Sequence, residues 1–225
     1  MTPLRLAVAL DGCPEADLPA LVEAAERARL DFVTLPASAT DLGLRAKVGL
    51  LITRADDVRR LELEPAPGAG GPGTEVRACV VGDDPAEAVA EADIAFTVVA
   101  TPEQTPPAVS ALRELRAGSP RPTEKLLVFA DLRLGLGTDL HLGTADDGLP
   151  LLSGPAAGLA SRLQGWQRTG LDGFRVRADG LDELEVLTRA VIPALLENDA
   201  FRRGYESKTL RGVLGLPPAR VEATA

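Results

Sequence analysis

The sequence predicts an α/β fold in which parallel strands alternate with helices. Three observations carry this prediction: short apolar runs recur along the 225 residues, amphipathic helical patterns separate most of them, and Gly, Pro or Asp residues mark the junctions. We expect seven strands. Two architectures fit this pattern, a (β/α) barrel and a doubly wound open sheet, and seven strands are one short of a complete barrel.

The first half of the chain alternates clearly. The apolar run 4–10 stops at Asp11-Gly12, and residues 18–28 then show apolar side chains at helical spacing with a proline in the first turn. Further apolar runs predict strands at 32–35, 48–52, 76–81 and 94–99. Helices are expected at 54–63, which has a mixed charged face, and at 85–92, which Asp83-Asp84 precedes.

The second half continues the alternation less regularly. Strands are expected at 126–130 and 174–177, and helices at 107–116, 156–168 and 182–196. Pro193 is expected to kink the last helix or to end it early. Residues 131–153 contain four glycines and are expected to be irregular.

Composition excludes several classes of protein. There are 24 Lys+Arg against 33 Asp+Glu, a net charge of -9, so a nucleic acid or an anionic membrane is not the expected partner. Two cysteines are too few for a disulfide framework, and no apolar run approaches the ~20 residues of a membrane span. The first residues carry no signal-peptide pattern. We expect a soluble cytoplasmic protein.

Isolated motifs identify no reaction. Residues 68–73 match G-x-G-x-x-G, but a proline-rich stretch precedes them and a strand follows, which indicates a linker. His141, the only histidine, lies in a glycine-rich region without a nucleophile motif, and no metal site is expected. Asp83-Asp84 is read as a helix cap, with a divalent-cation role as the alternative. Trp166 and Phe174 are expected in the core.

Blocks at both ends of the chain resemble one enzyme family. The N-terminal blocks are Leu-Asp-Gly at 10–12, residues 24–28 and residues 31–35, and a middle block is Ala-Asp-Ile-Ala-Phe-Thr at 92–97. The C-terminal blocks are residues 172–174, 191–193, 201–202, 205–206, 209–211 and 214–217. In this order they resemble the luciferase-like flavin-dependent monooxygenases, and most closely the branch of the nitrilotriacetate and dibenzothiophene-sulfone monooxygenases.

The resemblance implies a TIM-barrel-like (β/α) fold, truncated or incomplete, with about seven parallel strands in a single domain over residues 1–225. Residues 64–75 would be a Gly/Pro linker that replaces a deleted segment, and residues 198–225 a C-terminal arm. Family members are usually dimers that use FMN, reduced by a partner reductase, and O2 to oxygenate a small organic molecule. The implied cofactor is therefore reduced FMN, or a deazaflavin.

The residues that the resemblance assigns to cofactor binding are Asp11, Ser38, Thr53 and Gly82, all expected at strand ends on one face. It assigns no catalytic residue. The family has an acidic-acidic-Ser segment where this chain has Pro36-Ala37-Ser38, so only the serine remains. Asp83-Asp84 follows Gly82 near the expected phosphate position, where each like-charge pair at ~5 Å costs on the order of 3 kcal/mol.

Three functions therefore remain open. The first is an active flavin-dependent oxidoreductase acting on a small organic substrate with reduced flavin and O2. The second is a catalytically silent homologue that holds flavin, or none, and pairs as a scaffold with a full-length family member. The third is a binding or hydrolytic α/β protein of another kind, which only the strand–helix alternation supports.

Overall fold

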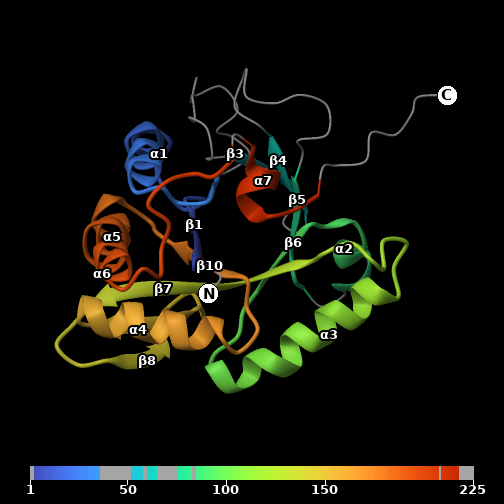
Figure 1. The fold of residues 1–225 in the computed structure, drawn as a ribbon. Helices are drawn as coiled ribbons and strands as arrows, with labels where there is room; N and C mark the ends of the chain where they lie inside the picture. The colour runs from blue at the N-terminus through green and yellow to red at the C-terminus, as the bar shows by residue number, and fades with distance from the viewer. Residues whose placement is uncertain are drawn as a thin grey trace.

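The computed structural model has one mostly parallel sheet flanked by helices (Figure 1). It describes residues 3–35, 52–57, 60–64, 76–82, 85–207 and 209–217. Expected features that fall on residues 36–51 and 65–75 lie outside this part of the chain. Within the described ranges, no helix is long and apolar enough to cross a bilayer.

The strands are short, and most are buried. They are β1 (Arg5–Ala9), β2 (Val33–Thr34), β3 (Ile52–Asp57), β4 (Arg60–Glu64), β5 (Val76–Val80), β6 (Ile94–Thr97), β7 (Leu127–Leu136), β8 (His141–Thr144), β9 (Pro150–Gly154) and β10 (Gly173–Arg177). The α-helices are α1 (Leu18–Arg27), α2 (Pro85–Glu91), α3 (Thr105–Ala117), α4 (Ala156–Gln167), α5 (Leu181–Glu185), α6 (Ile192–Glu197) and α7 (Leu210–Leu214).

The strand order confirms the expected incomplete (β/α) barrel. The ladder runs β10-β1-β2-β3-β4-β5-β6-β7, and β10 also pairs with β7. Seven of these strands are mutually parallel: β1, β2, β3, β5, β6, β7 and β10. β4 runs antiparallel between β3 and β5, so a hairpin strand stands where a complete (β/α) barrel has an eighth parallel strand.

Two sequence expectations were wrong. The helix expected at 54–63 is the β3–β4 hairpin, in which β4 also pairs with β5. The stretch Arg60-Leu61-Glu62-Leu63-Glu64 alternates apolar and charged residues, which also fits a strand, and pairing with β3 and β5 decides against the helix.

The region 131–153, expected to be irregular, continues as strands. β7 extends to Leu136, and β9 pairs parallel with its second half while β8 pairs antiparallel with β9. Leu132 and Leu134 alternate with Arg133 and Gly135, and the two leucines are buried. The glycines hid this two-residue period because glycine usually marks turns.

The last long helix is interrupted, as Pro193 predicted. α5 leads into a π-type turn over Val186–Val191, and α6 follows with Pro193 in its first turn. A proline has no N–H to donate to a carbonyl of the preceding turn. The wider turn ahead of Pro193 is the local distortion by which the helix accommodates this missing hydrogen bond.

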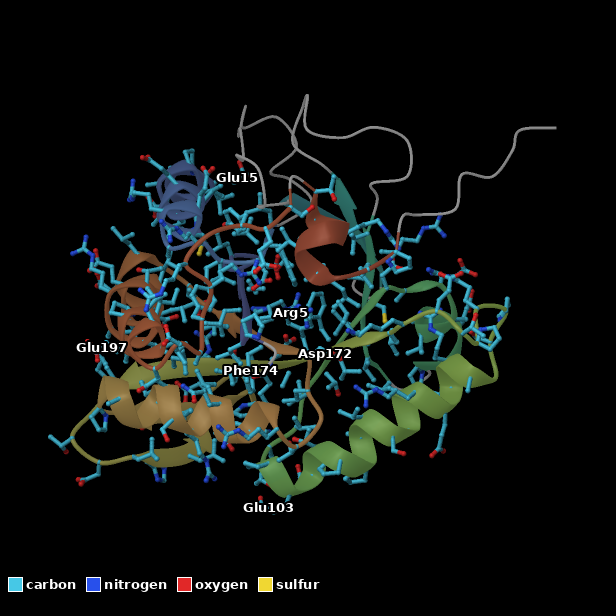
Figure 2. All side chains as sticks on the ribbon, viewed as in Figure 1. Arg5, Glu15, Glu103, Asp172, Phe174 and Glu197 are labelled. Atoms are coloured by element: carbon cyan, nitrogen blue, oxygen red, sulfur yellow. The ribbon has the colours of Figure 1, made fainter. Side chains whose placement is uncertain are left out.

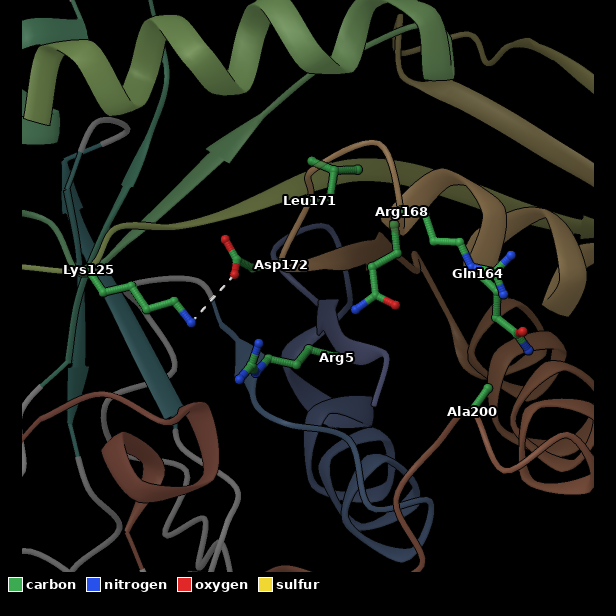
Figure 3. A pocket seen from close by; sticks show the side chains of 8 residues that line it. Arg5, Lys125, Gln164, Arg168, Leu171, Asp172 and Ala200 are labelled. Carbon is green, nitrogen blue, oxygen red and sulfur yellow. Dashed lines mark ion pairs between the residues drawn. The ribbon is translucent and has the colours of Figure 1, made fainter. Parts of the chain in front are cut away.

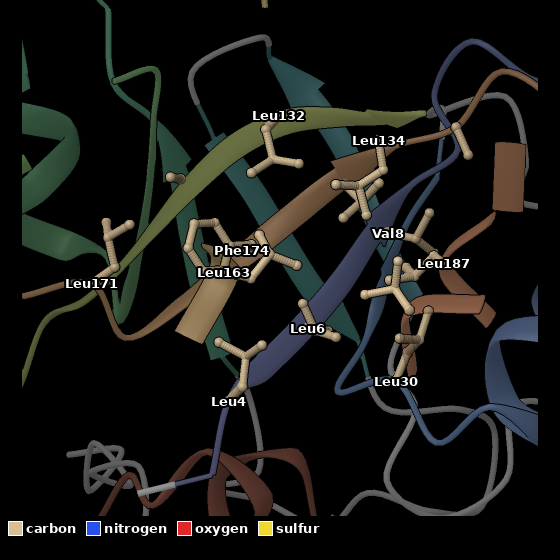
Figure 4. Packing of buried hydrophobic residues seen from close by; sticks show 14 of the residues in the cluster. Leu4, Leu6, Val8, Leu30, Leu132, Leu134, Leu163, Leu171, Phe174 and Leu187 are labelled. Carbon is tan, nitrogen blue, oxygen red and sulfur yellow. The ribbon is translucent and has the colours of Figure 1, made fainter. Parts of the chain in front are cut away.

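The apolar core has two parts that the sheet separates. The larger part lies between the strands and the outer helices and includes Leu6, Val8 and Phe174 (Figure 4). Trp166 from α4 belongs to it and stacks edge-on against Phe174 at 5.7 Å, as expected for core aromatics.

The smaller part fills the barrel interior. Phe32, Phe96 and Phe129 meet there with ring centroids 5.5–6.2 Å apart. α7 packs against this interior cluster through Leu210 and Leu214. Because the guanidinium of Arg5, at the start of β1, donates to the Leu214 carbonyl at 3.0 Å, α7 lies at the N-terminal ends of the strands.

An aspartate precedes three of the strands and joins each to a neighbouring strand. The backbone N–H groups of Asp31, Asp93 and Asp172 donate to the carbonyls of Leu6, Arg77 and Val128, at 2.7, 2.7 and 2.8 Å. The three carboxylates accept hydrogen bonds from the N–H groups of the same partner residues, at 2.8, 3.0 and 3.0 Å. These paired bonds fix the register at the N-terminal end of the barrel and leave its opposite end free for a site.

Candidate functional site

The opposite end of the barrel, where the parallel strands finish, gathers charged side chains from several strands. Asp11 follows β1, Thr34 ends β2, Asp131 lies in β7, and Arg175 and Arg177 lie in β10. Side chains alternate between the two faces of a strand, so residues two apart in β10 point to the same face. The carboxyl ends of barrel strands are also where barrel enzymes place their active sites.

Arg175 and Asp131 form a buried pair at the centre of this end. They are register partners on β10 and β7, and the guanidinium donates to both carboxylate oxygens, at 2.8 and 2.6 Å. The guanidinium carbon also lies 3.8 Å from the centroid of the Phe96 ring. Although burial disfavours the charge, the Asp131 carboxylate holds the pKa of Arg175 above its usual range.

Asp11 is the least satisfied polar residue of this group. Its Oδ1 atom is buried and has no hydrogen-bond partner among the described residues. The Thr34 hydroxyl lies near enough to the carboxyl group to lower its pKa slightly, and the Arg177 guanidinium lies 3.9 Å from Oδ2. Burial raises the pKa of Asp11 above its ordinary value, and the positive charges of Arg175 and Arg177 only partly oppose this. Asp11 can therefore hold a proton at higher pH than a surface aspartate and still has an oxygen to offer a ligand.

A second charged group adjoins the first. Arg133 in β7 donates to Asp147, Asp179 and Glu183, with distances of 2.9, 2.5 and 3.1 Å. The two groups meet at Gly12, because a Cβ there would lie only 2.7 Å from the Asp179 carboxylate. A side chain at position 12 would therefore push Asp179 out of place.

The charges at this end of the barrel do not balance. The described strand ends carry three guanidinium groups, from Arg133, Arg175 and Arg177, and five carboxylates. These are Asp11, Asp131, Asp147, Asp179 and Glu183. With all of them ionised, this set has an excess of two negative charges, which favours a neutral or cationic group and opposes a dianionic phosphate.

The four expected cofactor-binding residues lie in different places in the structure, and one of them is outside the described residues. It places Asp11 among the charged strand ends. Thr53 lies in β3, where its backbone is the register partner of Thr34, and Gly82 follows β5 with open space where a Cβ would stand. Ser38, like Asp83 and Asp84, lies outside the described residues. Asp11 and the backbone of Thr53 are thus both next to Thr34.

Sequence reasoning did not name the residues at the centre of this group, Arg175 and Asp131. A signal was present: Arg175 sits between Phe174 and Val176 in a run read as a buried strand, where a charge needs a partner. His141, expected in the irregular glycine-rich region, lies exposed in β8 instead. No grouping of His, Cys, Asp and Glu in the described ranges could hold a metal ion.

Comparisons with known proteins show a shared fold at low sequence identity. No protein-family model matches the chain, and no curated protein does. The EDTA monooxygenase EmoA from Chelativorans sp. BNC1 is similar in structure, with a TM-score of 0.67 and 13% identity over 96% of this chain and 99% of that one. The long-chain alkane monooxygenase LadA gives a TM-score of 0.67 at 10% identity, covering 96% of each chain.

A third similar structure is the riboflavin lyase RcaE, solved with modified FMN and its substrate riboflavin. It gives a TM-score of 0.66 at 11% identity over 96% of this chain and 97% of that one. Together these structures show that the chain shares their (β/α)-barrel fold, although its barrel is incomplete. At these identities the likeness is one of fold.

Proposed function

We propose that this protein is a flavin-dependent oxidoreductase, of the monooxygenase type, that binds its flavin and a small organic substrate at the carboxyl ends of the barrel strands. The fold supports the proposal, because the chain matches two monooxygenases and a riboflavin lyase over nearly its whole length. The observation that carries it to a site is Asp11, whose buried Oδ1 atom lacks a partner at the end of the barrel where such folds bind ligands.

The strand ends fit the flavin ring system. The isoalloxazine is flat and uncharged when oxidised, with an edge of N–H and C=O groups. Asp11 Oδ1 offers a free acceptor to such an edge, and the Thr34 hydroxyl lies beside it. When bound, the flavin supplies the electron transfer that side chains cannot perform. We assign to Asp11 the roles of orienting the ring and of holding a proton near it, because its pKa is raised.

The fit to the flavin phosphate is poorer. The excess of two negative charges among the described strand ends opposes a phosphate dianion in their midst. Reduced FMN, or a deazaflavin, would therefore bind with its phosphate directed away from Arg133 and from the three carboxylates that pair with Arg133. We further propose that a partner reductase supplies the reduced flavin and that the chain pairs with a second copy or with a full-length homologue.

The test is a titration of the purified protein with FMN and riboflavin, followed through the absorbance and fluorescence of the ring. We expect micromolar affinity, and Asp11→Asn should weaken it at least tenfold. The control is Asp199→Asn, an exposed aspartate in a left-handed backbone conformation that asparagine also adopts. Failure of FMN, riboflavin and a deazaflavin to bind at about 100 μM would overturn the proposal.

A second candidate is a homologue that holds flavin without turnover. The observation that favours it is the Arg175–Asp131 pair, in which each charge is satisfied by the other and the guanidinium lies over Phe96, so neither is free to act on a substrate. The two candidates differ in one measurement. Flavin binding without oxygen consumption, when a reductase and candidate organic substrates are present, would select the silent form.

A further inference from the structure

A cavity of about 270 Å³ opens at the N-terminal end of the barrel, away from the candidate site (Figure 3). Arg5, which begins β1, lines it, whereas Asp11 follows the other end of the same strand. Six residues of extended strand separate the two by about 20 Å. The cavity lies among the start of β1, the residues before β7 and β10, and the C-terminal turn of α4, and Ala200 closes one side.

The lining is positively charged in a chain of net charge -9. Arg5, Lys125 and Arg168 line the cavity together with one carboxylate, that of Asp172. Lys125 lies 3.7 Å from this carboxylate, and Arg113, outside the lining, lies 3.5 Å from it. Asp172 is therefore compensated without Arg5 or Arg168, and the cavity keeps an excess of positive charge. Acidic side chains such as Glu15, Glu103 and Glu197 lie at the periphery instead (Figure 2).

Unused hydrogen-bond donors face the same space. Gln164, one of the lining residues, has a buried Nε2 atom with no hydrogen-bond partner in the part of the chain that the structure describes. Among the described residues, the Arg5 guanidinium makes one hydrogen bond, to the Leu214 carbonyl, although a guanidinium carries five N–H donors. A buried donor without an acceptor is destabilising, so an occupant that accepts hydrogen bonds would be favoured here.

The position in the fold explains why this sector is open. The aspartates before β2 and β6 are covered by the C-terminal segment, which supplies Arg202 to Asp31 and Arg211 to Asp93. Asp172, the third aspartate of this kind, has the half-exposed Lys125 and Arg113 as its cationic partners among the described residues. The C-terminal segment thus covers the aspartates before β2 and β6 but not Asp172 before β10, and the cavity lies beside Asp172.

We propose that this cavity is a binding site for a small oxyanion, a phosphate or carboxylate group, that is held by Arg5, Lys125 and Arg168 and by the free amide of Gln164. Charge, unused donors and size all agree with this ligand class, since planar guanidinium groups and ammonium groups are the usual partners of such anions. The site is separate from the proposed flavin site and does not depend on it.

The experiment measures thermal unfolding and titration calorimetry with inorganic phosphate as the probe, against sodium chloride at equal ionic strength. At about 20 mM phosphate we expect the Tm to rise by about 5 °C. Gln164→Met keeps the length of the side chain but removes the donor, and Arg168→Gln removes a charge. Each should reduce the phosphate-dependent shift by at least half, while Gln164→Met alone leaves the Tm in chloride unchanged or higher.

Arg162→Gln is the matched control, because Arg162 is exposed on the same helix and does not line the cavity. It should keep the full phosphate shift, and Asp11→Asn should keep it too. Succinate in place of phosphate distinguishes a carboxylate from a phosphate preference. Equal Tm values in phosphate and chloride, or an equal loss of the shift in Arg162→Gln, would overturn the proposal.

Discussion

Asp11 shows how a single residue can lower stability where a ligand is expected. Its carboxyl group is largely buried, Oδ1 has no partner, and burial raises its pKa above the ordinary value. Residues held in this way are typical of functional sites, because the environment that perturbs them is the one that binds a ligand. The neighbouring Arg175–Asp131 pair is the opposite case, with every charge compensated.

Asp11→Asn should therefore stabilise the free protein at neutral pH, by about 1 kcal/mol. Because the pKa of Asp11 is higher in the folded than in the unfolded state, the folded protein binds more protons between the two values. Stability then falls as the pH rises through the folded pKa, and the neutral asparagine avoids this loss. The gain should disappear below the ordinary pKa of an aspartate. Urea denaturation at pH 7 and near pH 3 measures it.

The control for this measurement is again Asp199→Asn, which should change stability little at either pH because Asp199 is exposed. A gain from Asp11→Asn that persisted unchanged under acidic conditions would show that packing, and not the charge of Asp11, causes it. A loss of stability at neutral pH would contradict the assignment of Asp11 as an unsatisfied residue.

At the scale of elements, the three strand-start aspartates share backbone bonds but differ in their cations. Asp93 forms ion pairs with Arg121 and Arg211, at 2.8 and 2.9 Å. Asp93 and Arg211 are nearly fully buried, and Arg121 is less so. Asp172 has partners at 3.5 and 3.7 Å that are half exposed. Similar sequence positions thus have unequal energetic roles.

Asp93→Asn should destabilise the protein by about 3 kcal/mol, because it removes the buried carboxylate that compensates the charges of Arg211 and Arg121. Asp172→Asn, the matched variant, should cost less than about 1 kcal/mol, since exposed pairs are screened by water and salt. Both variants keep an oxygen that can accept the strand N–H. Free energies of unfolding in urea compare the two, and equal losses would show that the backbone bond matters more than the ion pairs.

The elements also show how far sequence reasoning reaches. Strands such as β1 and β6 were predictable because each is a short apolar run between turn residues, a pattern that local chemistry decides. β4 was not, because its alternating Leu and Glu residues become a strand only by pairing with both neighbours. Asp11 was expected at a strand end through the family resemblance and lies after β1, whereas the Arg175–Asp131 contact joins residues 44 apart and depends on the register of β10 and β7.

At the scale of the whole molecule, charge is distributed unevenly between the two ends of the barrel. The carboxyl ends of the strands carry more carboxylates than guanidinium groups, and the cavity at the opposite end has more cations than anions. The chain as a whole has a net charge of -9, so the charge of the cavity is opposite in sign to that of the rest of the protein. An anion should therefore prefer the N-terminal end, and a neutral ring the other.

This distribution predicts how salt changes flavin binding. Raising the ionic strength from about 20 mM to about 300 mM shortens the Debye length from ~20 Å to ~6 Å and screens repulsion between the FMN phosphate and the strand-end carboxylates. FMN affinity should rise about threefold, while that of riboflavin, which has the same ring without the phosphate, should stay constant. Glu183→Gln removes one of these carboxylates and should reproduce part of the gain at low salt. Fluorescence titration of the ring measures each value, and an FMN affinity that falls with salt would show that cations hold the phosphate.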